Sequence, residues 1–154
     1  MTQRAAIQTI VVGLDGSKHA EAAMAWAVLM ARGMGSQIVA VYGIAPTIYM
    51  DSMYTSYVPP PEFDPEWRAA MKKEFDEDWT RLARAAGVVC RTVMEDGRPA
   101  SVIVRVADEV KADLILVGRR GRGGVTELLL GSVSHEVVLH SKRPVLVVSE
   151  APPA

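Results

Sequence analysis

The sequence predicts an α/β fold: a single domain in which a five-stranded parallel open sheet carries helices on both faces. Five short apolar runs alternate along the chain with segments whose apolar residues recur at helical spacing. The 154 residues suffice for one domain with a proper core. Strand–helix–strand units of this length connect by right-handed crossovers, which makes the strands parallel.

The first third of the chain contains two predicted strands with a helix between them. Residues 9–14 (TIVVGL) are β-branched and continuously apolar, which is typical of a strand covered on both faces. A turn and a helix N-cap follow at 15–17, and apolar residues then recur at helical spacing over 18–33. The next apolar run predicts a second buried strand over 38–42.

The segment of about 45–65 differs in composition, because prolines, tyrosines and methionines crowd into it. We expect a long loop, whose aromatic part at 49–57 is either solvated or a lid or partner-binding segment. A helix with Pro65 at its first position is expected to continue to about residue 86. Residues 88–94 form the third predicted strand.

The second half of the chain continues the alternation of strands and helices. Apolar residues mark one face of a helix over 102–110, and the apolar runs at 114–117 and 144–148 predict the fourth and fifth strands. A helix of about 126–141 is expected between these strands. The tail at 150–154 is expected to be short and disordered.

The composition limits the classes of function that the protein can have. The chain is 49% hydrophobic and 23% charged, as in an ordinary globular protein, and its formal net charge of −1 argues against a nucleic-acid partner. Cys90 is the one cysteine, which excludes an internal disulfide and a cysteine-based zinc site. The sequence shows neither a membrane-spanning apolar run nor a signal-peptide core before the first strand, so we expect no membrane partner and a cytoplasmic location.

The strongest functional signal is the glycine-rich segment GRRGRGG at 118–124, which follows a buried strand directly and precedes Gly131, Ser132 and Ser134. Glycines let a backbone approach a ligand closely, and a helix N-terminus offers free N–H groups with a partial positive charge. The two serine hydroxyls add donors. The order suits a polyphosphate, although the Gly-Lys-Ser/Thr ending of a P-loop is missing.

Further candidate residues stand at the ends of predicted strands. Asp15, Val41 and Gly118 all lie at or just after the carboxyl end of a strand. In open α/β sheets, ligands bind beyond these ends, at the point where the strand order reverses. One crevice is therefore expected to gather the three positions.

The glycine spacing identifies a family resemblance. Gly118, Gly121, Gly131 and Ser132 fit the pattern Gly-x2-Gly-x9-Gly-(Ser/Thr), and the chain resembles the universal stress protein family, specifically its nucleotide-binding branch. The similarity covers about residues 8–149 of a single domain. The other segments that resemble the family are VVGLDGS at 11–17, DGRPASVIVRVADEVKADLILVG at 96–118 and LLLGSVSHEVVLHSKRPVLVV at 128–148.

The resemblance implies a Rossmann-like fold of the adenine-nucleotide alpha hydrolase type with strand order 3-2-1-4-5. It also implies a site for ATP, with Mg²⁺ held through the phosphates. Asp15 would hold the ribose hydroxyls or lie near the metal and phosphates, Val41 would meet the adenine through its backbone, and Gly118 would approach the ribose and phosphate. The remaining implied ligand-binding residues are Gly121, Arg122, Gly131, Ser132, Val133 and Ser134.

Family members commonly form homodimers, and the resemblance places the interface at the last strand, Val145–Val148. An exposed terminal strand of this composition would otherwise leave an unprotected sheet edge. The implied role is a nucleotide-dependent module in a stress response that acts on an unidentified protein partner.

Three other functions remain open at this stage: a slow ATPase or phosphotransferase, a cyclic-nucleotide binder, and an interaction module without a nucleotide. Phosphoryl transfer needs a positioned nucleophile and strong charge stabilisation. The sequence offers Asp15 and Glu127 as carboxylates near the loop, without an obvious partner for either, so no residue is assigned as catalytic. His135 and His140 lie five apart, which does not favour a shared metal ion.

Structural explanations compete with the functional ones. The glycines could form a flexible connection, Asp15 could be only a turn residue, and Ser132 and Ser134 could be capping hydroxyls. The arginines of the loop could point into solvent, and among them we single out Arg122 as a ligand contact.

Overall fold

The structure is a computed structural model that describes residues 7–45, 64–122 and 130–154. Five parallel strands form one sheet in the order β3-β2-β1-β4-β5, which confirms the predicted fold class and strand order. Their bounds are β1 (Thr9–Gly13), β2 (Gln37–Ile44), β3 (Cys90–Asp96), β4 (Leu114–Gly118) and β5 (Val145–Val148). Most of the predicted loop at 45–65 lies outside the described residues.

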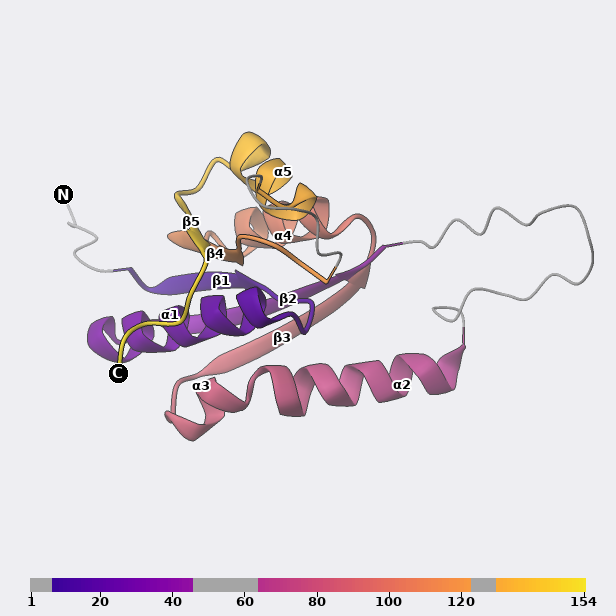
Figure 1. Cartoon of the computed structure of the whole chain (residues 1–154), viewed down its shortest axis with the longest axis horizontal. Helices are drawn as coiled ribbons and strands as arrows, with labels where there is room; N and C mark the ends of the chain where they lie inside the picture. The colour runs from indigo at the N-terminus through magenta and orange to yellow at the C-terminus, as the bar shows by residue number, and fades with distance from the viewer. Residues whose placement is uncertain (1–6, 46–63, 123–129) are drawn as a thin grey trace, which may run out of the picture.

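Helices cover both faces of the sheet (Figure 1). On one face lie α1 (Lys18–Met34) and a helical unit made of α2 (Pro65–Glu74), the π-helical turn η2 (Phe75–Trp79) and α3 (Arg81–Ala85). On the other face lie α4 (Pro99–Glu109) and α5 (Ser132–His140). Each face has its own apolar core, as the layered architecture requires.

The central strand β1 explains why its sequence is apolar without alternation. Ile10 and Val12 pack into the core beneath α1, whereas Val11 packs into the core beneath α4. Successive side chains of a strand point to opposite faces, so a strand covered on both sides needs apolar residues throughout. All three side chains are fully buried.

The predicted start of α1 is confirmed in detail. The Ser17 hydroxyl accepts a hydrogen bond from the Ala20 N–H at 3.2 Å, which is the contact of an N-cap. Gly35 ends the helix in the left-handed conformation, with φ of 69°. The turn before the helix therefore fixes the direction in which α1 leaves the carboxyl end of β1.

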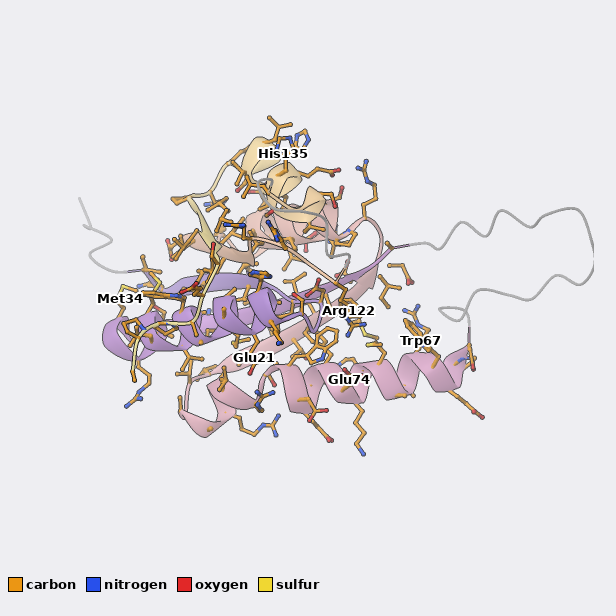
Figure 2. All side chains as sticks on the ribbon, in the orientation of Figure 1. Glu21, Met34, Trp67, Glu74, Arg122 and His135 are labelled. Atoms are coloured by element: carbon orange, nitrogen blue, oxygen red, sulfur yellow. The ribbon has the colours of Figure 1, made fainter. Side chains whose placement is uncertain are left out.

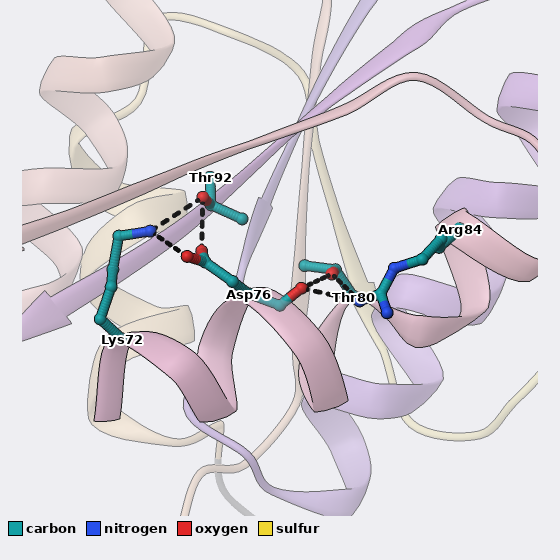
Figure 3. A network of polar contacts seen from close by, with 5 residues as sticks. All are labelled: Lys72, Asp76, Thr80, Arg84 and Thr92. Atoms are coloured by element: carbon teal, nitrogen blue, oxygen red, sulfur yellow. Dashed lines mark hydrogen bonds and ion pairs between the residues drawn. The ribbon is translucent and has the colours of Figure 1, made fainter. Parts of the chain in front are cut away.

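The single helix predicted to continue from Pro65 to about residue 86 is interrupted by η2, and this is a correction. A π turn leaves carbonyl groups without their usual helical donors. The Thr80 hydroxyl donates to the Asp76 carbonyl at 2.6 Å, and Arg84 donates to the carbonyls of Asp76 (2.8 Å) and Glu77 (2.7 Å). Figure 3 shows these side chains around the turn. Side chains thus supply the donors that the backbone does not.

The same turn is fastened to the sheet through the Asp76 carboxylate. The Thr92 hydroxyl of β3 donates to Asp76 Oδ1 at 2.7 Å, and Lys72 pairs with the other carboxylate oxygen (Figure 3). Carboxylate and hydroxyl groups that bond across elements fix the position of a helix over its strand. The π turn is therefore held in place from both β3 and α3.

Two other boundaries differ from the expectation. The helix predicted over about 126–141 begins at Ser132, because Gly131 has the extended φ and ψ of an N-cap; residues 126–129 lie outside the described ranges. The tail at 150–154 contains no helix or strand, but it is placed beside α1. The Trp26 indole N–H donates to the Glu150 carbonyl at 2.8 Å, where Figure 1 shows the tail passing α1.

Candidate functional site

A cavity of about 1060 Å³ opens at the carboxyl ends of the central strands. Its walls come from the ends of β1, β2 and β4, the loop after β4, the first turn of α2 and the N-terminal turn of α5. β1 and β4 are neighbours in the sheet, and the chain continues from β1 to β2 on one side and from β4 to β5 on the other, so the strand order reverses between them. The cavity therefore occupies the topological switch point where α/β proteins bind their ligands.

The structure brings eight of the nine predicted site residues to this cavity. They share positions at strand ends, in the glycine-rich loop or at the start of α5. They are Asp15, Gly118, Gly121, Arg122, Gly131, Ser132, Val133 and Ser134.

Val41 is the predicted residue that does not line the cavity. Its side chain is fully buried beneath α4, and its carbonyl accepts the Leu14 N–H at 2.9 Å. The sheet therefore already uses one of the Val41 backbone groups through which adenine was expected to be met. The part of β2 that reaches the cavity begins one residue later, at Tyr42, because β2 extends to Ile44 rather than ending at residue 42.

The glycines of the motif permit close contacts within the protein. A Cβ atom at Gly118 would lie 2.6 Å from the backbone carbon of His19, so this glycine lets the first turn of α1 pack on the end of β4. A Cβ at Gly121 would lie 2.6 Å from Asp15 Oδ2, and one at Gly131 would lie 3.2 Å from the Arg119 carbonyl oxygen. The glycine spacing thus folds the loop tightly against residues 15–19 and against itself.

The start of α5 offers backbone donors to the cavity. The first amides of an α-helix have no intrahelical acceptor, and Gly131 has no side chain to cap them. The amide groups concerned are those of Ser132, Val133 and Ser134, whereas the His135 N–H already donates to the Gly131 carbonyl at 2.9 Å. Together with the helix dipole, these amides form a site that suits an anion.

The Ser134 hydroxyl makes its contacts within the protein. The side chain is only 2% exposed, and its Oγ lies 3.0 Å from both the Arg119 and the Gly131 carbonyl oxygens. A hydroxyl has one proton to donate, and here it faces two backbone acceptors. The Ser134 hydroxyl therefore ties the loop to α5, and Ser132, which is exposed, keeps its hydroxyl available.

Asp15 links the end of β1 to the glycine-rich loop. Its Oδ1 accepts the Ser17 N–H at 2.9 Å, as in an Asx turn, and its Oδ2 accepts the Arg122 N–H at 3.2 Å. Asp15 is thus both the turn residue and a cavity residue, so the two readings of the sequence are compatible. A carboxylate has about four acceptor sites, which leaves capacity for ligand hydroxyl groups.

Sequence reasoning missed the aromatic residues of the site. Tyr42 and Trp67 line the cavity, and Figure 2 shows Trp67 extending from the first turn of α2 toward the sheet. Tyr42 packs against Phe75 and Trp79, with ring centroids 5.9 and 4.9 Å away. Burial raises the pKa of the Tyr42 phenol above its ordinary value, so the group stays neutral at physiological pH. The usable signal was the position of Tyr42 directly after a buried apolar run.

The charges of the loop are arranged toward the cavity. Arg120 and Arg122 line it, whereas Arg119 does not. The Nε atoms of Arg119 and Arg120 are shielded from solvent without a hydrogen-bond partner in the described part of the chain. Two guanidinium groups and the N-terminus of α5 thus give a local positive charge in a protein whose net charge is −1.

The comparisons with known proteins agree with this fold. A model of the universal stress protein family matches residues 6–149. A universal stress protein of Thermus aquaticus is 33% identical over 149 residues, which cover 92% of this chain and 98% of the relative. Universal stress protein YxiE of Bacillus subtilis is 35% identical over 143 residues, which cover 90% and 97%. The chain belongs to the universal stress protein family.

Solved structures place the fold in the same group. A universal stress protein crystallised in complex with cAMP is 30% identical, has a TM-score of 0.70 and aligns over 96% of this chain and 100% of that one. Universal stress protein UspA from Lactobacillus plantarum is 26% identical, with a TM-score of 0.71 over 94% and 99% of the two chains. In the described ranges, no helix is both long and apolar enough to cross a membrane.

Proposed function

We propose that this universal stress protein binds an adenine nucleotide, ATP together with Mg²⁺, in the cavity at the carboxyl ends of β1 and β4. The observation that carries the proposal is the contrast between the two parts of the cavity. Free amides of α5, Arg120 and Arg122 supply donors for an anion, while Tyr42, Ile44 and Trp67 supply an apolar and aromatic surface for a flat base. A ligand that suits both parts is anionic at one end and planar at the other.

The number of donors favours several phosphate groups over one. The amides of Ser132, Val133 and Ser134 and the guanidinium groups of Arg120 and Arg122 can all face a ligand. A cyclic phosphodiester has two non-bridging oxygens, and donors that it leaves unpaired on binding cost free energy. Cyclic AMP is nevertheless the second candidate, because a relative that is 30% identical was crystallised with it.

Asp15 is proposed to accept the ribose hydroxyls or to contribute one oxygen to the metal. The described residues contain no group of three His, Cys, Asp or Glu side chains that could hold a metal ion. Mg²⁺ keeps several of its waters and is usually bound through ligand phosphates with one or two carboxylates. A magnesium ion would therefore arrive with ATP, and its charge would offset the Asp15 carboxylate beside the phosphates.

The biological role that we propose is regulation: a cytoplasmic stress-response module whose bound nucleotide is read by a protein partner. The proposed homodimer interface is the free edge of β5, where Leu146 is 37% exposed, together with Val138 and Leu139 of α5, which are exposed as well. An apolar edge strand of this kind is usually covered. A slow ATPase or phosphotransferase is the enzymatic alternative; of its two candidate carboxylates, Glu127 lies outside the described residues.

Calorimetric titration of nucleotide-stripped protein with Mg-ATP tests the proposal, followed by identification of the recovered nucleotide. Binding with ATP recovered intact supports a binding module. Recovery of ADP in excess over protein supports the enzyme. A competing titration with cAMP orders the two ligands, and a folded protein that binds neither contradicts the proposal.

A further inference from the structure

One contact at the edge of the cavity joins the glycine-rich loop to the π turn. The Arg122 guanidinium carbon lies 5.4 Å from the centroid of the Trp79 ring, within the range of a cation–π contact. Figure 2 shows Arg122 on the side of the site that faces the α2 unit. The contact therefore connects a residue of the proposed binding site to a part of the chain that does not line the cavity.

The Trp79 ring is held in place by contacts other than the one with Arg122. Its centroid lies 4.9 Å from that of Tyr42 and 5.6 Å from that of Phe75, both in edge-to-face geometry. Its indole N–H donates to a Glu74 carboxylate oxygen at 3.0 Å. The π turn that ends at Trp79 is itself fastened to β3 through Asp76. The ring is thus a fixed surface rather than a freely rotating side chain.

Gly16 lies against both the Arg122 guanidinium group and the Trp79 ring. A Cβ atom at this position would lie 2.4 Å from Arg122 Nη2 and 2.7 Å from Trp79 Cζ2. Gly16 also has φ of 76°, a conformation that residues with a side chain rarely adopt. The guanidinium group and the Trp79 ring therefore meet beside Gly16, where the absence of a side chain leaves room for both.

The donors of Arg122 remain available while it contacts Trp79. The guanidinium group has five N–H donors, and its side chain makes no hydrogen bond or ion pair with the residues that the structure describes. Its backbone is also held, since the Arg122 N–H donates to Asp15 at 3.2 Å. Main chain and side chain are thus both positioned while the N–H groups stay free for an anion.

We propose that Trp79 is a positioning residue, which holds the Arg122 guanidinium at the cavity so that it meets a phosphate of the bound nucleotide. This inference rests on the proposed nucleotide binding. Without the ring, an exposed arginine would lose rotamer freedom on binding, and that cost weakens affinity. The expected benefit of the ring is about two- to fivefold in affinity, which corresponds to the strength of an exposed cation–π contact.

A double-mutant cycle tests the inference in the full chain. Affinity for Mg-ATP is measured by calorimetry for the wild type, Trp79→Leu, Arg122→Gln and the double variant. We expect Trp79→Leu to weaken binding about two- to fivefold in the presence of Arg122 and to have no further effect once Arg122 is replaced. Trp79→Phe keeps an aromatic face and should retain most of the affinity.

Two further variants separate positioning from general damage. Trp26→Leu removes a tryptophan that packs against the same core on α1 but does not line the cavity, so its affinity should stay at the wild-type value. Gly16→Ala adds a Cβ against both the Arg122 guanidinium group and the Trp79 ring without removing either, so it should disturb their contact and weaken ATP binding even if Trp79→Leu fails to fold.

The outcomes distinguish this inference from the proposed function. Equal weakening by Trp79→Leu with and without Arg122 would show a purely structural role and overturn the inference. If the wild-type protein binds ATP and the affinity is unchanged in Trp79→Leu and in Gly16→Ala, this inference is overturned and the proposed function is not. Wild-type protein that is folded and does not bind ATP would overturn the proposed function and this inference with it.

Discussion

Replacing Ser134 by alanine separates the structural role of its hydroxyl from a role in ligand binding. The Ser134 hydroxyl is buried and lies 3.0 Å from the carbonyl oxygens of Arg119 and Gly131. The Arg119 carbonyl also accepts the Gly131 N–H at 2.8 Å, so it keeps one partner when the hydroxyl is removed. The loss is therefore that of one net hydrogen bond, about 1 kcal/mol in the free energy of unfolding.

Urea unfolding followed by circular dichroism measures this loss. For a domain of about 150 residues, a change of about 1 kcal/mol corresponds to about 2–4 °C in the midpoint of thermal unfolding. Ser132→Ala is the matched control, because Ser132 lies at the same helix start but is exposed to the cavity. We expect Ser132→Ala to leave stability within about 0.5 kcal/mol of the wild type and to weaken ATP binding.

The two serines should thus show opposite patterns. Ser134→Ala should lower stability with a smaller effect on ATP affinity, and Ser132→Ala should do the reverse. A Ser134→Ala protein with unchanged unfolding free energy but abolished ATP binding would refute the reasoning. That result would mean that the hydroxyl turns away from Arg119 and donates to the ligand.

Three other predictions test the site, the burial of Tyr42 and the dimer. Gly121→Val should abolish ATP binding by displacing Asp15, whose Oδ2 lies 2.6 Å from the added Cβ, whereas Gly33→Val, with open space around it, should bind normally in the same titration. Burial raises the pKa of Tyr42 in the folded protein, so the stability of the protein should fall as the pH rises above 10. Ultraviolet titration of the wild type should show a tyrosine that ionises above its ordinary pKa, and Tyr42→Phe should lack this tyrosine. Leu146→Asp should shift sedimentation from dimer to monomer; a wild type that is monomeric at every concentration would contradict the proposed interface.

The fold could be predicted because the strands and the crossovers have strong local signals. The run at 9–14 is apolar without alternation since β1 is buried on both faces, and Ser17 caps α1 as its sequence position indicates. Local signals do not predict the strand order, because it depends on which strands pair in space. The correct prediction of this order came from the family resemblance. The glycine spacing identified the cavity residues of the loop after β4 and of the start of α5, because all of them lie within the single stretch 118–134.

The missed features depend on contacts between distant segments. The π turn needs Thr80 and Arg84 to supply donors and Thr92 of β3 to hold Asp76, and no helical periodicity reveals that combination. Alternation along β2 buries the Val41 side chain beneath α4, so any contribution of Val41 to the site has to come from its backbone, as predicted for it. Trp79 was read as part of a helix, and its contact with Arg122 links two residues that the sequence keeps far apart.

The glycine-rich motif of this chain can be understood as a division of roles between residues that shape the loop and residues whose donors stay free for the proposed ligand. Gly118, Gly121 and the Ser134 hydroxyl make their close contacts within the protein. They fix the loop before a ligand arrives, which lowers the entropy that binding must overcome. The α5 amides and the arginine side chains are then left with free donors. A glycine substitution should therefore act through loop geometry, whereas an Arg122 substitution should act through charge, and only the second effect should diminish as salt screens the exposed guanidinium.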